Sequence, residues 1–201
     1  KEPNSIKLMK GQQVADNPIM SFWSGYGASG RGQGSLWDGI RACNTLIANI
    51  DQAVDMTQVE KNTWKAEATV LKAYYHFLLL NYYGPIPIVD VNLPIDASDE
   101  ELRVHRNTVD EVVNYILNTL DLSISDLPER VTGSNDLGRM DQVIAHAIKS
   151  KVSLYAASPL FNGNSEFYSD FLNHEGIHFF NQNNEISKWE TAAMAAEDAI
   201  A

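Results

Sequence analysis

The longest regular pattern of apolar and polar residues in the chain runs from Thr57 to Gly84. Apolar side chains recur there at steps of three and four residues, which predicts a helix with a buried face: Val59, Ala66, Val70, Tyr74, Phe77 and Leu78. Four further residues widen this face and predict burial on more than one side: Leu71, Tyr75, Leu79 and Tyr82. Thr57 and Glu60 have the spacing of a capping box, and Gly84 followed by Pro85 ends the helix. We expect this helix to be the central element of the fold.

The same periodicity predicts helices at 36–53, 108–125 and 141–157, and a last helix that opens at Ser187. Each begins at a residue whose side chain can accept a hydrogen bond from the first free backbone N–H groups: Ser35, Thr108, Asp141 and Ser187. Short connections make antiparallel hairpins of 36–53 with 57–83 and of 108–125 with 141–157. The predicted fold class is therefore all-α, with irregular tetratricopeptide-like helical hairpins and long loops, although no exact internal repeat is visible.

Two regions follow from this pattern. Residues 1–34 lack helical periodicity and contain a glycine-rich run, so we expect an N-terminal loop segment there. Residues 35–201 form the helical region. Its last helix has no terminating glycine or proline and no partner helix to cover its apolar face. We therefore expect the helical region to be truncated at its C-terminal end.

Composition excludes several classes of function. The formal net charge of −11 argues against binding to nucleic acid or to an anionic membrane surface, which call for an excess of lysine and arginine. No apolar run approaches the roughly 18 residues that a membrane span needs. The single cysteine, Cys43, lies on an apolar helical face, where a buried inert thiol is expected. We expect no cofactor.

Two motifs suggest chemistry that their surroundings do not favour. Gly25, Gly27 and Gly30 match a dinucleotide-binding pattern, but that pattern needs a preceding strand and a helix that opens on its third glycine. His174, Glu175 and His178 match the zinc peptidase motif H-E-x-x-H, in which two histidines one helical turn apart hold the metal. Gly176 and the surrounding asparagines favour a loop there. A zinc peptidase stays open as the less favoured alternative, and no metal is expected.

Two long motifs resemble those of a known family. The first is Ala-Glu-Ala from residue 66, then Leu-Lys-Ala-Tyr-Tyr-x-Phe from residue 71 and Tyr-Gly-x-x-Pro from residue 83. The second is Gly138-Arg139, followed by the helix at 145–157 and Ser-Pro-Leu-Phe-Asn from residue 158. Together with segments 37–51 and 106–121, they are similar to the SusD/RagB family of nutrient-binding outer membrane lipoproteins, and this chain resembles the N-terminal part of such a protein.

The resemblance implies a function without catalysis. Members of the family bind extracellular glycans, either oligosaccharides or polysaccharides, and deliver them to a SusC-like TonB-dependent outer membrane transporter. It also implies a surface-exposed lipoprotein at the cell outer membrane, attached only through a lipid anchor whose cysteine is not in this chain. The alternative is a tetratricopeptide-like scaffold that binds proteins and has no affinity for sugars.

The candidate binding residues are aromatic and amide side chains on predicted loops. Sugar rings stack their C–H faces on aromatic rings, and their hydroxyls need amide, guanidinium or carboxylate partners. One group lies in the glycine-rich segment and a second follows the helix at 141–157: Trp23, Tyr26, Arg31 and Gln33, then Phe161 and Asn162. The alternative for Trp23 is that it fills the helical core. We expect Trp37, Trp64 and Trp189 to lie in the core because they are on predicted helices.

Overall fold

The computed structural model describes residues 3–14, 16, 18–25 and 34–200, and this part of the chain is helical. Its helices are α1 (Asn4–Met9), α2 (Leu36–Asn49), α3 (Gln58–Tyr83), α4 (Val109–Ile124), α5 (Gln142–Ala157), α6 (Ser165–Tyr168) and α7 (Ile186–Ile200), with a 3₁₀ turn at Ile50–Gln52. Extended pairing within the described residues is limited to isolated bridges, at Asn162 with Asn181 and at Leu172 with His178. The all-α prediction is confirmed.

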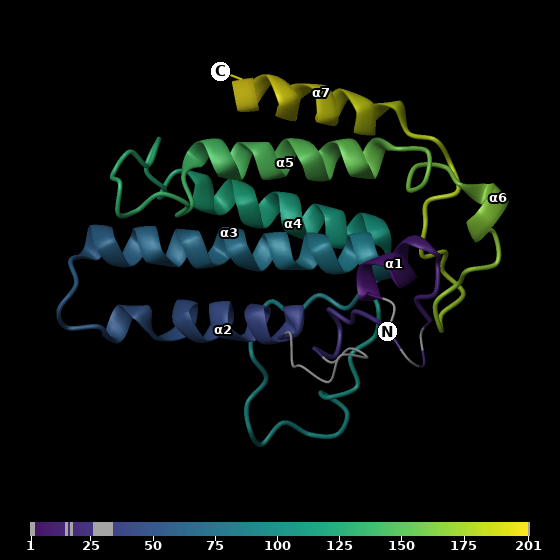
Figure 1. Ribbon diagram of the computed structural model, residues 1–201, viewed down its shortest axis with the longest axis horizontal. Helices are drawn as coiled ribbons and strands as arrows, with labels where there is room; N and C mark the ends of the chain where they lie inside the picture. The colour runs from purple at the N-terminus through teal and green to yellow at the C-terminus, as the bar shows by residue number, and fades with distance from the viewer. Residues whose placement is uncertain (1–2, 15, 17, 26–33, 201) are drawn as a thin grey trace.

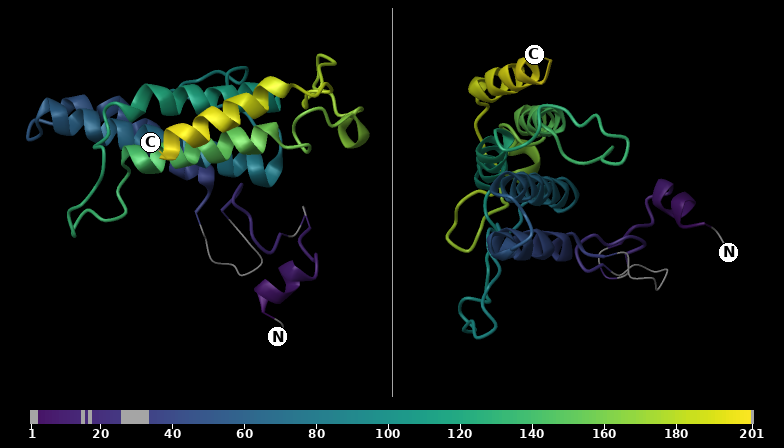
Figure 2. Two further views of the ribbon diagram at one scale, coloured as in Figure 1. Left: turned by 90° about the horizontal axis from the view of Figure 1, so that it is seen from above. Right: turned by 90° about the vertical axis from the view of Figure 1, so that its left-hand side faces the viewer.

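The five long helices lie side by side in the order α2, α3, α4, α5, α7, each antiparallel to the one before (Figure 1). This alternation brings the start of α2, the end of α3 and the start of α4 to the same end of the molecule (Figures 1 and 2). The end of α5 and the start of α7 lie there too. We call this end, with residues 18–25, 84–108 and 158–186, the loop end. The antiparallel hairpins predicted from the sequence are present.

Helix α3 is the centre of the fold because it contacts α2 on one side and α4 and α5 on the other. Its buried residues accordingly spread around more than one face: Ala66, Ala68, Val70, Lys72, Ala73, His76, Phe77, Leu79 and Leu80. Helix α2 approaches it closely at Gly39, where an added Cβ would lie 2.8 Å from the Tyr75 ring. A glycine in a helix interior is otherwise unfavourable, so this close approach is the reason for it.

The predicted caps stabilise four helix starts, and at the start of α5 the Asp141 carboxylate accepts from the Ile144 N–H at 2.9 Å. Complete capping boxes join Ser35 to Asp38 in α2 and Thr57 to Glu60 in α3. A third box joins Thr108 and Glu111 at the start of α4. These bonds hold the pKa of Glu60 and of Glu111 below the usual range, because the Thr57 and Thr108 backbone N–H groups donate to the carboxylates. Gly84 ends α3 with φ 71°, a backbone conformation that residues with a Cβ rarely adopt.

Several boundaries differ from the sequence prediction. The helix expected at 36–53 becomes 3₁₀ after Asn49, as helix ends commonly do. Helix α7 begins at Ile186, so Ser187 lies inside the helix and is not its cap. The predicted N-terminal loop segment includes α1, whose six residues are too few to show a periodicity. The predicted loop after α5 includes the short helix α6.

Four residues expected to be buried are exposed, and one of them, Tyr82, lies at the candidate site described below. Val59 lies in the first turn of α3, before the buried stretch that starts at Ala66. Trp64 is 43% exposed, and the Arg139 guanidinium lies 4.8 Å from its ring. Trp189 is equally exposed because α7 buries only its small residues, Ala192 and Ala195. Trp37 is half-buried and packs against the core, as expected.

Candidate functional site

A cleft of about 720 Å³ at the loop end joins three parts of the chain. The N-terminal segment lines it with residues 13, 14, 16, 18, 20, 21, 23 and 24. The last two residues of α3 and Arg106, from the connection before α4, complete its walls. A larger open groove of about 870 Å³ runs along the outer face of α2, but no aromatic side chain lines it. A sugar ring needs a flat apolar face to stack on, so we take the cleft as the candidate site.

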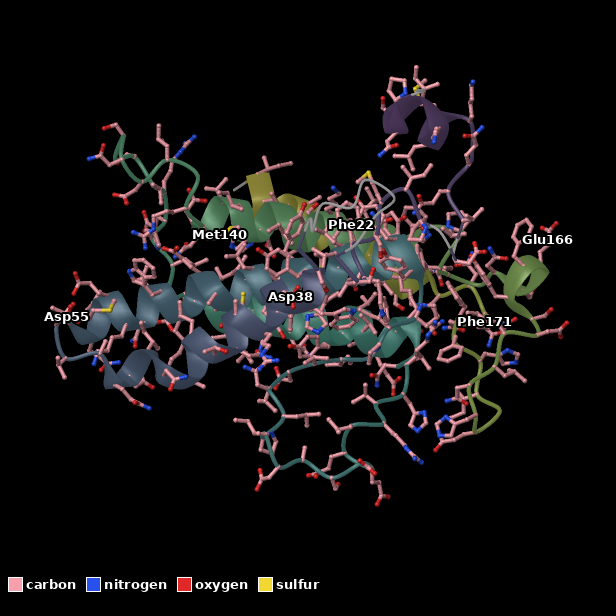
Figure 3. The ribbon with its side chains drawn as sticks, turned by 60° about the horizontal axis from the view of Figure 1, so that its bottom comes forward. Phe22, Asp38, Asp55, Met140, Glu166 and Phe171 are labelled. Carbon is pink, nitrogen blue, oxygen red and sulfur yellow. The ribbon has the colours of Figure 1, made fainter. Side chains whose placement is uncertain are left out.

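Trp23 supplies the largest aromatic surface of this cleft. Its ring meets the rings of Trp37 and Tyr83 edge-on, at centroid distances of 5.1 and 5.3 Å. The side chain nevertheless stays 37% exposed, so it is held by the helix ends without being enclosed by them. Beside it, Tyr82 is 54% exposed and stacks on Phe22 at 4.9 Å. Figure 3 shows Phe22 beside the helical body on the N-terminal segment. The cleft thus presents partly exposed aromatic rings from two separate segments.

The backbone of Phe22 and Trp23 is held at all four of its polar groups. Both N–H groups donate to the hydroxyl oxygen of Tyr83, at 2.9 and 3.0 Å. The Phe22 carbonyl accepts from the Leu36 N–H at 2.9 Å, and the Trp23 carbonyl accepts from the Ser35 hydroxyl at 2.8 Å. This segment is therefore fixed between the start of α2 and the end of α3.

Polar groups of both signs flank the aromatic rings. Gln13 folds back on its own segment, because its side-chain oxygen accepts from the Ile19 N–H at 2.8 Å. Asp16 and Arg106 line the cleft and are exposed. Arg106 is placed by its neighbour Asn107, whose N–H donates to the Ile86 carbonyl at 2.9 Å. A carboxylate and a guanidinium next to aromatic faces provide hydrogen-bonding partners for sugar hydroxyls.

A polar network joins the buried residues Lys72 and His76 of α3 to the connection that follows the helix, where Asp90 is exposed. Lys72 donates to the Asp90 carboxylate at 2.9 Å, and the Tyr115 hydroxyl donates to the same oxygen at 2.9 Å. The fully buried His76 donates from Nδ1 to the Lys72 carbonyl and accepts the Val89 N–H at Nε2. Burial is the main cause that lowers the pKa of His76 to about 4. The ring is therefore neutral and structural at neutral pH.

The structure places the candidate residues from the sequence in different settings. Trp23 lines the cleft, whereas Tyr26, Arg31 and Gln33 lie outside the described residues. Phe161 is 4% exposed and packs between Tyr155 and Phe180.

Asn162 is also 4% exposed. Its amide oxygen accepts from the Glu185 N–H at 2.9 Å, and its amide nitrogen donates to the Glu185 carbonyl at 3.0 Å. These bonds fasten the start of α7 to the end of α5. Because Phe161 and Asn162 are enclosed by the chain itself, neither is part of the binding proposal below.

Sequence reasoning missed the residues that the fold brings to Trp23. The periodicity predicts a buried face for Tyr82, and no motif marks Tyr83 or Arg106 as a binding residue. All three lie more than 50 positions from Trp23 in the sequence, and no periodicity relates residues at such a distance. The available signal was two adjacent tyrosines in the last turn of a helix, directly before its terminating glycine.

The zinc peptidase motif lies on a turn. Asn173 N–H donates to the Ile177 carbonyl at 2.8 Å, and Gly176 has φ 80°. His174 stacks on His105 at a centroid distance of 4.1 Å. The two motif histidines therefore lack the helical turn that brings them to one metal. Among the residues that the structure describes, His, Cys, Asp and Glu side chains form no group of three that could hold a metal ion.

Comparison with known proteins identifies the family. The model of a SusD-like family, described as starch-binding and associating with the outer membrane, matches residues 33–154, more than half of the chain. The chain therefore belongs to the SusD-like family. A SusD-like protein from Bacteroides ovatus is 24% identical, over 77% of this chain and 30% of that protein.

Solved structures agree with this assignment. BT4246 is 28% identical with a TM-score of 0.81, over 99% of this chain and 32% of that one. A SusD-like protein (BF3747) from Bacteroides fragilis is 27% identical with a TM-score of 0.55, over 61% of this chain and 23% of that one. A laminarin binding SusD-like protein is 26% identical with a TM-score of 0.54, over 61% of this chain and 25% of that one.

The chain spans about a third of the length of the first of these relatives. Within the described part, none of the helices has the length and apolar character needed to cross a membrane. The family description places its members at the outer membrane by association.

Proposed function

We propose that this chain belongs to a surface glycan-binding protein of the outer membrane, and that the cleft around Trp23 forms part of the glycan site. Binding is non-catalytic in this proposal. The observation that carries it is the partly exposed Trp23 ring in the cleft, with Tyr82 and Arg106 beside it. Sugar rings stack on such aromatic faces, while the guanidinium and carboxylate groups bond to their hydroxyls.

Relatives support the ligand class. One relative is described as a laminarin binding SusD-like protein. Two further proteins that share the fold, at 20% identity, are described with xylogluco-oligosaccharide and with laminarihexaose. These descriptions favour oligosaccharides or polysaccharides over smaller ligands for this chain.

We further propose that the whole protein is a surface-exposed lipoprotein that delivers glycan to a SusC-like TonB-dependent transporter. The outer face of α7 supports a protein contact, because Ile186, Trp189 and Ile200 are exposed along it. Their spacing of three and eleven residues is that of an apolar stripe on a helix. Co-purification of the native protein with a transporter from outer membranes tests this part. A protein recovered alone under mild detergent would contradict it.

Affinity electrophoresis of the full-length protein in gels that contain single polysaccharides tests glycan binding. The proposal predicts retardation by at least one glycan and a loss of about tenfold or more in affinity for Trp23→Ala, the size expected when an aromatic anchor is removed.

Trp64→Ala is the matched control. Trp64 is similarly exposed and lies on the same helix as Tyr83, but about 28 Å away at roughly 1.5 Å per residue. Its replacement should leave affinity unchanged. Equal losses of affinity in the two variants would refute the proposed site. If no glycan retards the wild-type protein, the proposed function is refuted.

A further inference from the structure

Tyr83 connects the end of α3 to the segment that carries Trp23. Its ring lies in the last turn of α3, and its hydroxyl oxygen accepts two backbone N–H groups from consecutive residues, Phe22 and Trp23. The donors are 61 and 60 positions away in the sequence. A single side-chain atom thus satisfies two consecutive backbone donors of a segment that lies outside any helix.

The same residue also contacts the Trp23 side chain. The two rings meet at a centroid distance of 5.3 Å and an interplanar angle of 74°. The hydroxyl fixes the backbone from which the indole extends, and the ring edge limits the rotation of the indole. Trp37 contacts the indole from α2, at 5.1 Å and 83°.

We infer that Tyr83 is the positioning residue of the cleft, and that its hydroxyl holds the Trp23 ring in the orientation that a sugar can stack on. The role of this orientation in binding rests on the proposed function. Tyr83 acts through Trp23 in this scheme, not by its own contact with the ligand. Ser35 and Leu36 hold the two carbonyls of this segment, and without the Tyr83 hydroxyl its two N–H groups would lose their acceptor, so the indole would sample more orientations. A fixed aromatic platform binds with a smaller loss of entropy.

The neighbouring tyrosine supplies a matched control. The Tyr82 ring stacks on Phe22, but within the described part of the chain its hydroxyl makes no hydrogen bond that the structure records. Tyr83→Phe and Tyr82→Phe therefore make the same chemical change one residue apart, and each keeps its ring. Only the first removes an acceptor from the Phe22 and Trp23 amides.

Hydrogen–deuterium exchange of the full-length protein, read by mass spectrometry on a peptide that covers residues 19–25, tests the positioning role without a ligand. Tyr83→Phe should raise the exchange rate of the Phe22 and Trp23 amides by about fivefold or more, the size expected for the loss of one ordinary hydrogen bond. Tyr82→Phe should leave it unchanged. Unchanged exchange in Tyr83→Phe, or an equal rise in both variants, would overturn the inference.

Glycan affinity then separates this inference from the proposed function. Tyr83→Phe should weaken binding by about threefold to tenfold, and Tyr83→Phe combined with Trp23→Ala should bind no worse than Trp23→Ala alone. Losses that add in the double variant would show a direct role for Tyr83 and would overturn positioning through Trp23. If the wild-type protein binds no glycan, the proposed function fails, and the exchange result alone decides whether Tyr83 positions Trp23.

Discussion

At the scale of single residues, His76 shows how a buried polar group is kept neutral. Its Nε2 accepts the Val89 N–H at 3.2 Å, so protonation would place two donors against each other. Removal from water is the largest cause, because it disfavours the charged ring, and the pKa of His76 is lowered to about 4 from an ordinary value of 6.5. Lys72 is the nearby buried cation, and it is paired with Asp90.

This shift makes the stability of the protein depend on pH. Because the folded-state pKa of His76 is below the unfolded one, the unfolded state binds more protons between pH 6.5 and 4, and stability falls as pH falls through that window. The free energy of unfolding should drop by about 2 kcal/mol from pH 7 to pH 5 through this group. Urea denaturation at the two pH values measures it.

The matched variant is His76→Gln, which cannot titrate. Its stability at pH 7 should be lower, but the drop between pH 7 and pH 5 should be smaller than in the wild type by about 2 kcal/mol. An equal drop in both proteins would assign the pH dependence to other groups.

At the scale of helices, the caps are the features that sequence and structure share most closely. Thr57 and Thr108 each accept from the backbone N–H three residues later, and each glutamate bonds back to the cap N–H. Ser187 and Glu190 have the same spacing, but α7 begins one residue earlier, and Ser187 lies within it. The capping-box spacing therefore predicts a helix start only where its first residue directly precedes the helix. Ser187 instead follows the first residue of α7.

Alanine substitutions at Thr108 and Ser187 test this difference between a cap and a residue inside a helix. Thr108→Ala should lower the free energy of unfolding by about 1 kcal/mol, because it removes the side-chain acceptor for the Glu111 N–H. Ser187→Ala should be neutral or slightly stabilising, because alanine has the higher helix propensity inside a helix. Thermal or urea unfolding of both variants measures the two effects. A loss of similar size in Ser187→Ala would restore Ser187 as a cap.

Helix positions, caps and the central place of α3 could be read from the sequence because they depend on neighbours within a few residues. The cleft could not, because it depends on hydrogen bonds from the Phe22 and Trp23 N–H groups to the Tyr83 hydroxyl, and such long-range bonds leave no periodic trace in the sequence. Phe161 and Asn162 were chosen for side-chain chemistry alone, and the pairing of Asn162 with Glu185 across 23 residues encloses them. Trp64 and Trp189 were expected in the core because helix position does not reveal which face has a neighbour.

At the scale of the whole molecule, the antiparallel order of α2, α3, α4, α5 and α7 gathers the connections 84–108 and 158–185 at one end (Figure 1). The opposite end has the short turn between α2 and α3 and the connection from α4 to α5. That connection is fastened to α3 by the Arg139 guanidinium, which donates to Glu67 at 2.7 Å. The rigid array thus carries a cleft built from loops and helix ends, an arrangement common in binding proteins.

The most direct test of this account is a crystal structure of the full-length protein with the oligosaccharide it binds. We predict a sugar ring stacked on the exposed face of Trp23, about 4 Å from the indole, with the Tyr83 hydroxyl still bonded to the Phe22 and Trp23 amides. An oligosaccharide bound elsewhere, with Trp23 covered by another part of the protein, would contradict it.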